Sequence, residues 1–303
     1  MNSNRKIHVN RNHKSSFFTK LFGENKDNAL SLYNAVNKSH YTNADDLIFT
    51  TIDDVIFMKQ KNDVSFLFAK SMNLYEHQST FNPNMPLRGF FYYADLYRQH
   101  IVKPTRIYGK NLVHIPAPNY IVFYNGPEKD FKDEVRELHL SDAFDGPTDS
   151  TKYEWTATML NINYGHNKAL FEQCRILEEY AILIDRIKSN SQRMSLEDAA
   201  DIAVTECIRD GILEPFLTKH QKEVINMILT EFDEEEYKEV LREDYYTEGK
   251  VDAILDFLGE LGPVPDFLSY KLYYYTSEQL RALTKLAARV DSVDEFVAGM
   301  SEV

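Results

Sequence analysis

Residues 63–78 constrain the fold of this chain more than any other stretch of its sequence. Two segments, Asp63–Phe68 and Asn73–Thr80, alternate aromatic or β-branched residues with polar ones, which is the pattern of half-buried strands. A short break at Ala69–Met72 separates them, and if a tight turn centred on Ala69-Lys70 lies there, the two strands form a hairpin. This hairpin sets Asp63 opposite Glu76, and the pleat puts Glu76 and Gln78 on one face of the sheet.

Two carboxylates that face each other on a sheet destabilise it unless a positive charge lies between them. The simplest such charge is a divalent cation. Mg²⁺ is bound by a few carboxylate oxygens, keeps several of its waters and accepts substrate phosphate as a ligand. Asp63 and Glu76 therefore form a candidate metal site, and Gln78 can hold an attacking water through its side-chain amide.

Composition excludes several other classes of protein. The 303 residues are 43% hydrophobic, enough for one large domain or two. No run of 18 apolar residues occurs, and Met1–Ser16 is basic without an apolar core, so we expect neither a membrane span nor a signal peptide. The two cysteines, Cys174 and Cys207, are too few for a disulfide framework and fit buried thiols of a cytoplasmic protein.

The charge of the chain is unevenly distributed. Residues 1–110 carry 15 Lys and Arg against 9 Asp and Glu, whereas residues 201–303 carry 10 against 23. The whole chain has a net charge of -13. The candidate metal site thus lies in the one basic third, as a protein that binds a phosphate backbone requires. A solvated acidic C-terminal half explains the asymmetry equally well.

The order of predicted elements is that of an α/β protein with one central sheet. A helix is expected over Phe17–Val36 with a break near Gly23, followed by strand residues at 47–58, the hairpin, a helix over Leu87–Ile101, and buried strands at Tyr120–Tyr124 and Tyr153–Ile162. Helices then follow at Ala169–Ser189, Ser195–Asp210, His220–Glu243, Ala253–Leu261, Glu278–Val290 and Val293–Met300. We expect a domain over residues 1–190, a helical extension over 191–245 and a small helical unit over 246–303.

Taken alone, an aspartate followed 13 residues later by Glu-x-Gln is a weak pattern, and a hairpin with a polar outer face accounts for it. The longer run is specific. Lys61-Asn-Asp63-Val-Ser-Phe-Leu and Glu76-His-Gln78-Ser-Thr-Phe-Asn-Pro-Asn-Met-Pro-Leu-Arg88-Gly closely resemble the recombination-promoting nuclease (Rpn), or putative transposase, family of the PD-(D/E)XK superfamily. Ile121-Val-Phe-Tyr-Asn-Gly and Leu160-Asn-Ile-Asn-Tyr-Gly-His-Asn167 resemble it in order and spacing.

The resemblance implies a restriction-endonuclease-like core with a mixed central sheet, followed by a helical C-terminal region. It implies a bacterial Mg²⁺-dependent DNA endonuclease, with Mn²⁺ able to substitute, linked to recombination or mobile elements. Asp63 and Glu76 would hold the metal, and Gln78 stands where the superfamily more often has lysine. We expect Arg88 and Lys61 to contact the DNA phosphates, with a surface ion pair for Arg88 and a solvated strand end for Lys61 as the alternatives.

Three further questions stay open at this point. A degenerate nuclease fold that only binds DNA or a protein partner is the first rival, and a toxin or defence nuclease is the second. Whether the chain forms a homodimer is also open.

Other side chains near the candidate site have structural roles as the first expectation. His77, on the face opposite Glu76, is expected to pack or be exposed. His166 is expected to shape a turn, with DNA contact as the alternative. The tyrosines at 92, 93 and 97 are expected to pack in the core or at an interface, with a base-stacking platform as the alternative.

Overall fold

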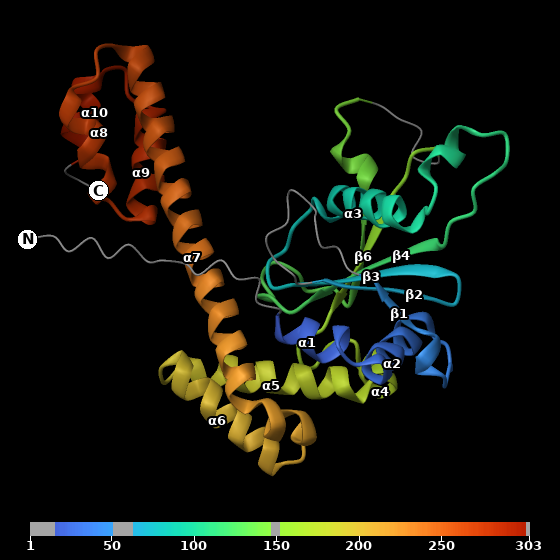
Figure 1. Ribbon diagram of the computed structural model, residues 1–303. Helices are drawn as coiled ribbons and strands as arrows, with labels where there is room; N and C mark the ends of the chain where they lie inside the picture. Colours follow the sequence, from blue (N-terminus) through green and yellow to red (C-terminus); the bar gives the residue numbers. More distant parts are fainter. Residues whose placement is uncertain (1–15, 51–62, 147–151, 301–303) are drawn as a thin grey trace, which may run out of the picture. The chain divides into compact units, whose positions relative to one another are not determined.

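The computed structural model describes residues 16–50, 63–146 and 152–300. The chain divides into two compact units, residues 1–231 and 232–303. The first contains one six-stranded mixed sheet in the order β1-β2-β3-β4-β6-β5 (Figure 1). Its strands are β1 (Ile48–Thr50), β2 (Asp63–Phe68), β3 (Ser71–Gln78), β4 (Ala117–Tyr124), β5 (Val135–His139) and β6 (Thr156–Asn161).

The sheet combines an antiparallel meander with a parallel centre. β1, β2 and β3 pair antiparallel, β3 pairs parallel with β4, β4 pairs parallel with β6, and β5 closes the edge antiparallel to β6. A parallel pair requires a crossover, and α3 (Met85–His100) supplies it between β3 and β4. The expected α/β class, with its mixed central sheet and a helical C-terminal region, is confirmed.

Helices cover both faces of the sheet. α3 lies on one face, while α1 (Phe17–Gly23), α2 (Lys26–Asn37), α4 (Lys168–Gln173) and α5 (Arg175–Ser191) lie on the other (Figure 1). The expected break near Gly23 is confirmed, because Asn25 caps a new helix by accepting from the amides of Asp27 and Asn28. Short 3₁₀ turns occur at η1 (Ala44–Asp46), η2 (Pro104–Tyr108) and η3 (Leu140–Ala143).

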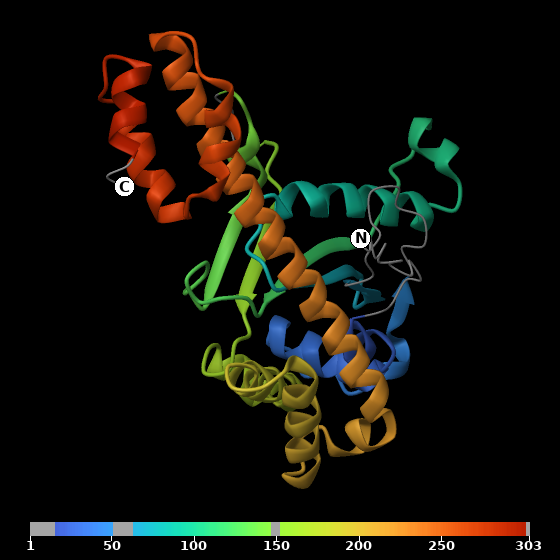
Figure 2. The ribbon, with the colours of Figure 1, turned by 90° about the vertical axis from the view of Figure 1, so that its left-hand side faces the viewer.

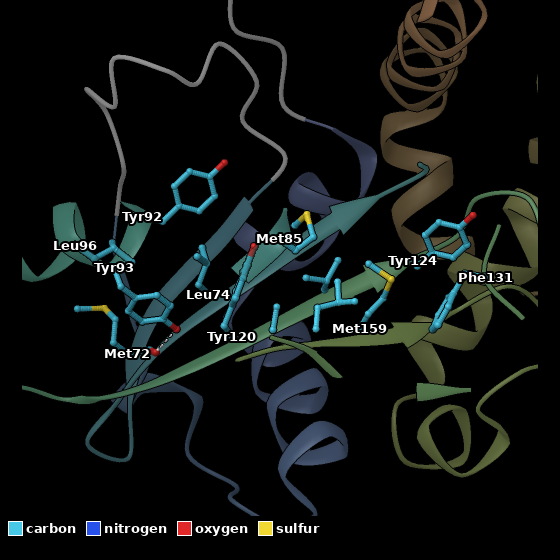
Figure 3. Packing of buried hydrophobic residues seen from close by; sticks show 13 residues of the cluster. Met72, Leu74, Met85, Tyr92, Tyr93, Leu96, Tyr120, Tyr124, Phe131 and Met159 are labelled. Carbon is cyan, nitrogen blue, oxygen red and sulfur yellow. Dashed lines mark hydrogen bonds between the residues drawn. The ribbon is translucent and has the colours of Figure 1, made fainter. Parts of the chain in front are cut away.

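Under α3, alternate residues of the strands form a hydrophobic core with the inner side of the helix (Figure 3). Tyr92 and Tyr93 are both buried in it, which confirms that these tyrosines pack in the core. Tyr93 also donates from its hydroxyl to the carbonyl of Met72, at 2.8 Å, and so ties α3 to the start of β3. The buried residues of this core are Met72, Leu74, Met85, Tyr92, Tyr93, Leu96, Tyr120, Val122, Tyr124, Phe131, Leu138, Ala157 and Met159.

The helical part of the chain begins as expected and then differs from expectation. α6 (Leu196–Arg209) starts at Ser195, whose hydroxyl accepts from the amide of Asp198. The separate helices expected at His220–Glu243 and Ala253–Leu261 are wrong, because one helix, α7 (Glu214–Leu261), covers both with non-helical backbone at His220. The polar run between them lacks any helix-breaking proline, so helical propensity carries through it.

The second unit, residues 232–303, has its own apolar core. It contains the end of α7 together with α8 (Asp266–Lys271), η4 (Leu272–Tyr274), α9 (Ser277–Ala287) and α10 (Val293–Gly299) (Figure 2). Thr276 begins α9 with a capping box shared with Gln279. The three-part division expected from the sequence, with boundaries at 190 and 245, stays a prediction.

Candidate functional site

The register of the β2–β3 hairpin is the one expected from its turn. Ala69 and Lys70 both have positive φ, 50° and 65°, which are the angles of a two-residue turn that matches the strand twist. The pairing sets Asp63 opposite Glu76. One detail of the expectation is wrong: the second strand begins at Ser71 rather than Asn73, because the turn takes only two residues. Lys61 lies outside the described residues.

Glu76 is the centre of the site and has no exposed surface. Gln78 donates from Nε2 to Oε1 of Glu76 at 2.7 Å, and the hydroxyl of Tyr120 donates to Oε2 at 2.6 Å. Nη2 of Arg88 also donates to Oε1 and forms an ion pair with the carboxylate. Burial raises the pKa of Glu76 above its ordinary value, and the charge of Arg88 and the three hydrogen bonds offset only part of that effect.

Arg88 reaches Glu76 from the first turn of α3. This helix starts after Asn84 with Pro86 in its first turn, a position where proline costs no backbone hydrogen bond. The hydroxyl of Tyr92, one turn later, accepts from Nε and Nη2 of Arg88 at 3.3 and 3.1 Å. Burial is the largest effect on Arg88 and lowers the pKa of the guanidinium, but Glu76, Tyr92 and Tyr120 together outweigh it, so the pKa is raised overall.

The positive charge that Glu76 requires is therefore present within the protein. The sequence predicts a divalent cation between Asp63 and Glu76 in this role, whereas the structure brings a guanidinium to the Glu76 carboxylate. The Arg88 side chain is 32% exposed, but its partner Glu76 is fully buried. The expected alternative, an ion pair at the surface, therefore fits only the exposed part of Arg88. Contact between Arg88 and DNA stays a prediction.

The hydrogen bonds that the described residues donate to Glu76 limit where a metal can bind its carboxylate. A carboxylate offers about four lone-pair positions, two on each oxygen. Gln78 and Arg88 fill those of Oε1, and Tyr120 takes one of Oε2. Among the contacts of residues 16–50, 63–146 and 152–300, this leaves one position on Oε2 for a monodentate ligand, and Asp63 pairs with Glu76 in the strand register. This oxygen-rich set fits Mg²⁺, which needs few protein ligands; within residues 16–50, 63–146 and 152–300, no cluster of three His, Cys, Asp or Glu residues could hold a metal.

Tyr120 is a site residue that the sequence did not reveal. It was expected only as part of a buried strand, and its partner Glu76 is 44 positions away in the chain. The parallel register pairs Tyr120 with Leu74, one pleat repeat from Glu76, so its hydroxyl reaches the carboxylate diagonally. Gly89 makes this possible, because a Cβ there would lie 2.3 Å from the Tyr120 ring.

On the opposite face of β3, His77 is a packing residue. Its ring stacks on Phe18 at 5.2 Å between centroids, and Nε2 hydrogen-bonds the Tyr180 hydroxyl at 3.1 Å. Burial, with the nearby charge of Lys188, lowers the pKa of His77 to about 3. The imidazole is thus neutral, and the expectation that it points away from Glu76 is confirmed.

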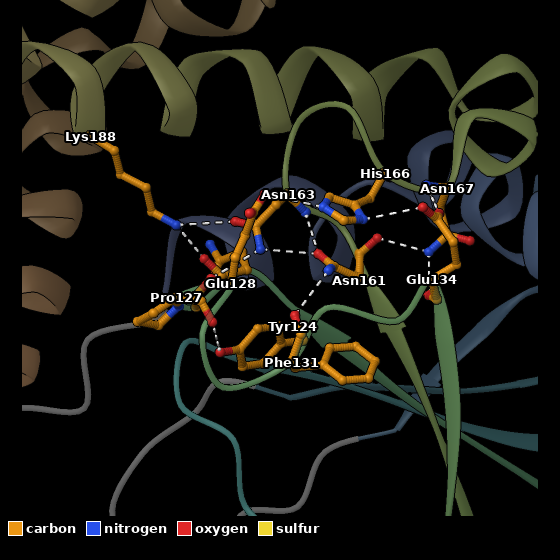
Figure 4. A network of polar contacts seen from close by, with 12 residues as sticks. Tyr124, Pro127, Glu128, Phe131, Glu134, Asn161, Asn163, His166, Asn167 and Lys188 are labelled. Atoms are coloured by element: carbon orange, nitrogen blue, oxygen red, sulfur yellow. Dashed lines mark hydrogen bonds and ion pairs between the residues drawn. The ribbon is translucent and has the colours of Figure 1, made fainter.

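A polar network ties together the loops at the C-terminal ends of β4 and β6 (Figure 4). Lys188 donates to the carbonyl of Asn125 and, at 3.3 Å, to Oδ1 of Asn163. His166 bridges two carboxylates, with Nδ1 3.2 Å from Glu134 and Nε2 3.3 Å from Glu128. The amide of His166 also donates to the carbonyl of Asn163 at 3.1 Å, which makes His166 a turn residue as expected; DNA contact by it stays an alternative.

Comparisons with protein-family models, with curated proteins and with solved structures found no match to this chain.

Proposed function

We propose that this chain is a metal-dependent DNA endonuclease of the recombination-promoting nuclease kind, with a core like that of the restriction endonucleases. The observation that carries the proposal is the hairpin register that sets Asp63 opposite Glu76, with the amide of Gln78 on the Glu76 carboxylate. The resemblance of residues 61–89 to that family and the mixed sheet, with a helix crossing from β3 to β4, support it further.

In this account Asp63 and Glu76 hold Mg²⁺, or Mn²⁺ in its place. The bound ion supplies charge neutralisation for the phosphoryl oxygens and an activated water. The protein contributes the arrangement around it. Tyr120 fixes the plane of the Glu76 carboxylate, and Gln78 has an amide oxygen left over that can accept a hydrogen bond from the attacking water.

Arg88 has two roles in the proposal. Without metal it neutralises Glu76, which explains how a fully buried carboxylate is tolerated in the resting protein. If a divalent metal ion also binds that carboxylate, the partly exposed guanidinium of Arg88 can turn to a substrate phosphate, for which its planar set of donors is suited. Lys61, in its expected place at the strand end, would add a second phosphate contact.

Nicking of supercoiled plasmid with Mg²⁺, with Mn²⁺ and with EDTA tests the proposal. We expect wild-type protein to cut only with metal, and Asp63→Asn and Glu76→Gln to abolish cutting. Glu137→Gln removes an exposed carboxylate of β5 in the same sheet and serves as the matched control with full activity. Asp63→Asn is the decisive variant, because Glu76→Gln also disturbs a buried ion pair. Failure of clean wild-type protein to cut with either metal overturns the proposal.

One observation favours a second candidate, a nuclease-like fold that binds DNA or a protein without cutting. Three donors within the protein already occupy the Glu76 carboxylate, and one of them carries the compensating charge. A site so completed is stable without metal. This candidate predicts that wild-type protein binds DNA with the same affinity with and without metal and does not cut it. Asp63→Asn should leave that affinity unchanged.

A further inference from the structure

The segment between α3 and β4, residues 101–116, projects beyond the end of the sheet (Figures 1 and 2). Both of its ends are held. The amide of Ile101 donates to the carbonyl of Tyr97, the Tyr97 hydroxyl donates to the carbonyl of Pro116 at 2.7 Å, and the amide of Ala117 donates to Lys70 of the β2–β3 turn. Between these anchors only the 3₁₀ turn η2 has regular structure. The segment is thus a projecting element on a fixed base.

This projecting segment is strongly basic in an acidic protein. No carboxylate occurs in the sequence between Asp95 and Glu128. Lys103, Arg106 and Lys110 fall in that interval, and all three are exposed. None of the three forms an ion pair with a residue that the structure describes, whereas Arg98, just before the segment, pairs with Asp95. Three exposed cations thus lie in one segment without an ion-pair partner in the described part of the chain.

Apolar side chains are interleaved with these cations. Val102, Tyr108 and Leu112 are 90%, 87% and 79% exposed, and Ile107 and Ile115 are about half exposed. Single exposed apolar residues are ordinary, but five in one segment indicate a surface that meets a partner. The partner must have negative charge at the spacing of the cations and apolar surface between the charges.

We propose that residues 101–116 are a DNA-binding element that grips the phosphate backbone through Lys103, Arg106 and Lys110 and packs Tyr108 and Leu112 into a groove. Duplex DNA offers both regular phosphates and apolar sugar and base edges. A protein of net charge -13 repels a polyanion, so a cluster of exposed cations decides where DNA can approach. This inference rests on the proposed function, since it identifies where the proposed nuclease holds its substrate.

The position of the segment agrees with that assignment. Arg88 stands in the first turn of α3 and the segment follows the last, so the helix separates them by about 18 Å along its axis. This separation corresponds to about five base-pair steps of duplex. DNA held by the segment and lying along α3 can therefore reach Arg88, the partly exposed partner of the buried Glu76.

Equilibrium binding of a short fluorescent duplex in EDTA tests the inference without cutting. The triple variant Lys103→Gln, Arg106→Gln, Lys110→Gln is expected to bind at least about tenfold more weakly. The slope of log affinity against log salt, which is negative, should also become less steep by about 2.7, because three phosphate contacts are lost. The control variant Lys129→Gln, Lys132→Gln, Lys168→Gln has the same change in net charge at exposed positions elsewhere and should match wild type.

The apolar part is tested by Tyr108→Ser with Leu112→Ser, which should weaken binding several-fold and leave the salt slope unchanged. Equal binding by the triple variant at Lys103, Arg106 and Lys110 and by the control variant overturns the inference. Absence of duplex binding by wild type overturns it as well. Loop-dependent binding to vesicles of anionic lipid without duplex binding overturns it in favour of a membrane contact. Loop-dependent binding without cutting refutes the nuclease proposal alone, and cutting that is independent of the loop refutes this inference alone.

Discussion

The guanidinium of Arg88, in the first turn of α3, forms an ion pair with the fully buried carboxylate of Glu76 at the centre of the sheet. This pair joins the crossover helix to the strand that carries the candidate site. In this pair the protein neutralises the Glu76 carboxylate by itself.

Arg88→Met removes the partner charge but keeps most of the aliphatic stem. A buried carboxylate left without its cation costs about 3 kcal/mol of unfolding free energy at neutral pH. The pKa of Glu76 is already raised by burial and rises further without Arg88. A raised carboxyl pKa stabilises the fold at low pH and loses that contribution as pH rises, so the deficit of the variant should shrink as pH falls.

Urea unfolding of wild type and of Arg88→Met at several pH values between about 5 and 8 checks the sign of this pH dependence. Arg98→Met is the control on the same helix. Its ion pair with Asp95 is largely exposed, so its loss should cost no more than about 0.5 kcal/mol at any pH. A deficit for Arg88→Met that grows toward acid pH would contradict the assignment of a buried, charge-dependent pair.

Tyr120→Phe removes the hydroxyl that donates to Oε2 of Glu76. Hydrogen bonds to charged groups contribute about 1.5–3 kcal/mol, and the aromatic packing of the ring is retained. Tyr120→Phe and Glu76→Gln should therefore be non-additive in a double-mutant cycle of unfolding free energies. Additive effects would show that the hydroxyl and the carboxylate are energetically independent.

Gly89→Ala places a methyl group 2.3 Å from the Tyr120 ring, so either α3 or the ring must shift. We expect a loss of about 1–3 kcal/mol, as for other overpacked cores, and a weaker Tyr120–Glu76 contact. Gly249→Ala, an exposed helical position with nothing within 4 Å of the new Cβ, should instead stabilise by up to about 1 kcal/mol. Calorimetric melting of both variants distinguishes a packing effect from helix propensity. Changes in melting temperature of the same sign for both variants would contradict a packing effect at Gly89.

The two-residue turn of the hairpin contains residues that tolerate positive φ poorly. Ala69→Asn with Lys70→Gly introduces the pair that this turn favours. We expect about 1 kcal/mol of added stability in denaturant unfolding without any change in register. Destabilisation by this substitution would mean that the turn, and with it the alignment of Asp63 with Glu76, differs from the one described.

The hairpin could be predicted from sequence because its information is local. Alternation fixes the faces of the strands, and a two-residue turn at Ala69-Lys70 fixes which residues are opposite each other. The helices at both ends were recognised from apolar spacing and from caps such as Ser195. These features depend on neighbours within a few positions in the chain, and they were predicted for that reason.

Features that depend on distant pairing were not predicted. β5 is an edge strand whose Arg136 and Glu137 interrupt any apolar pattern, and it exists because β6 pairs with it. Tyr120 joins the site only because β4 pairs parallel with β3 in one particular register. Arg88 was named as a candidate, but its partner became evident only once α3 was folded back over β3.

We propose that Asp63 and Glu76 together hold a divalent cation. Crystals soaked in Mn²⁺, with anomalous scattering recorded at the manganese edge, test this proposal. We expect one anomalous peak bound by Asp63 and by Oε2 of Glu76, and no peak in Asp63→Asn. Well-ordered density for both carboxylates with Arg88 on Glu76, and no peak at saturating Mn²⁺, would contradict it.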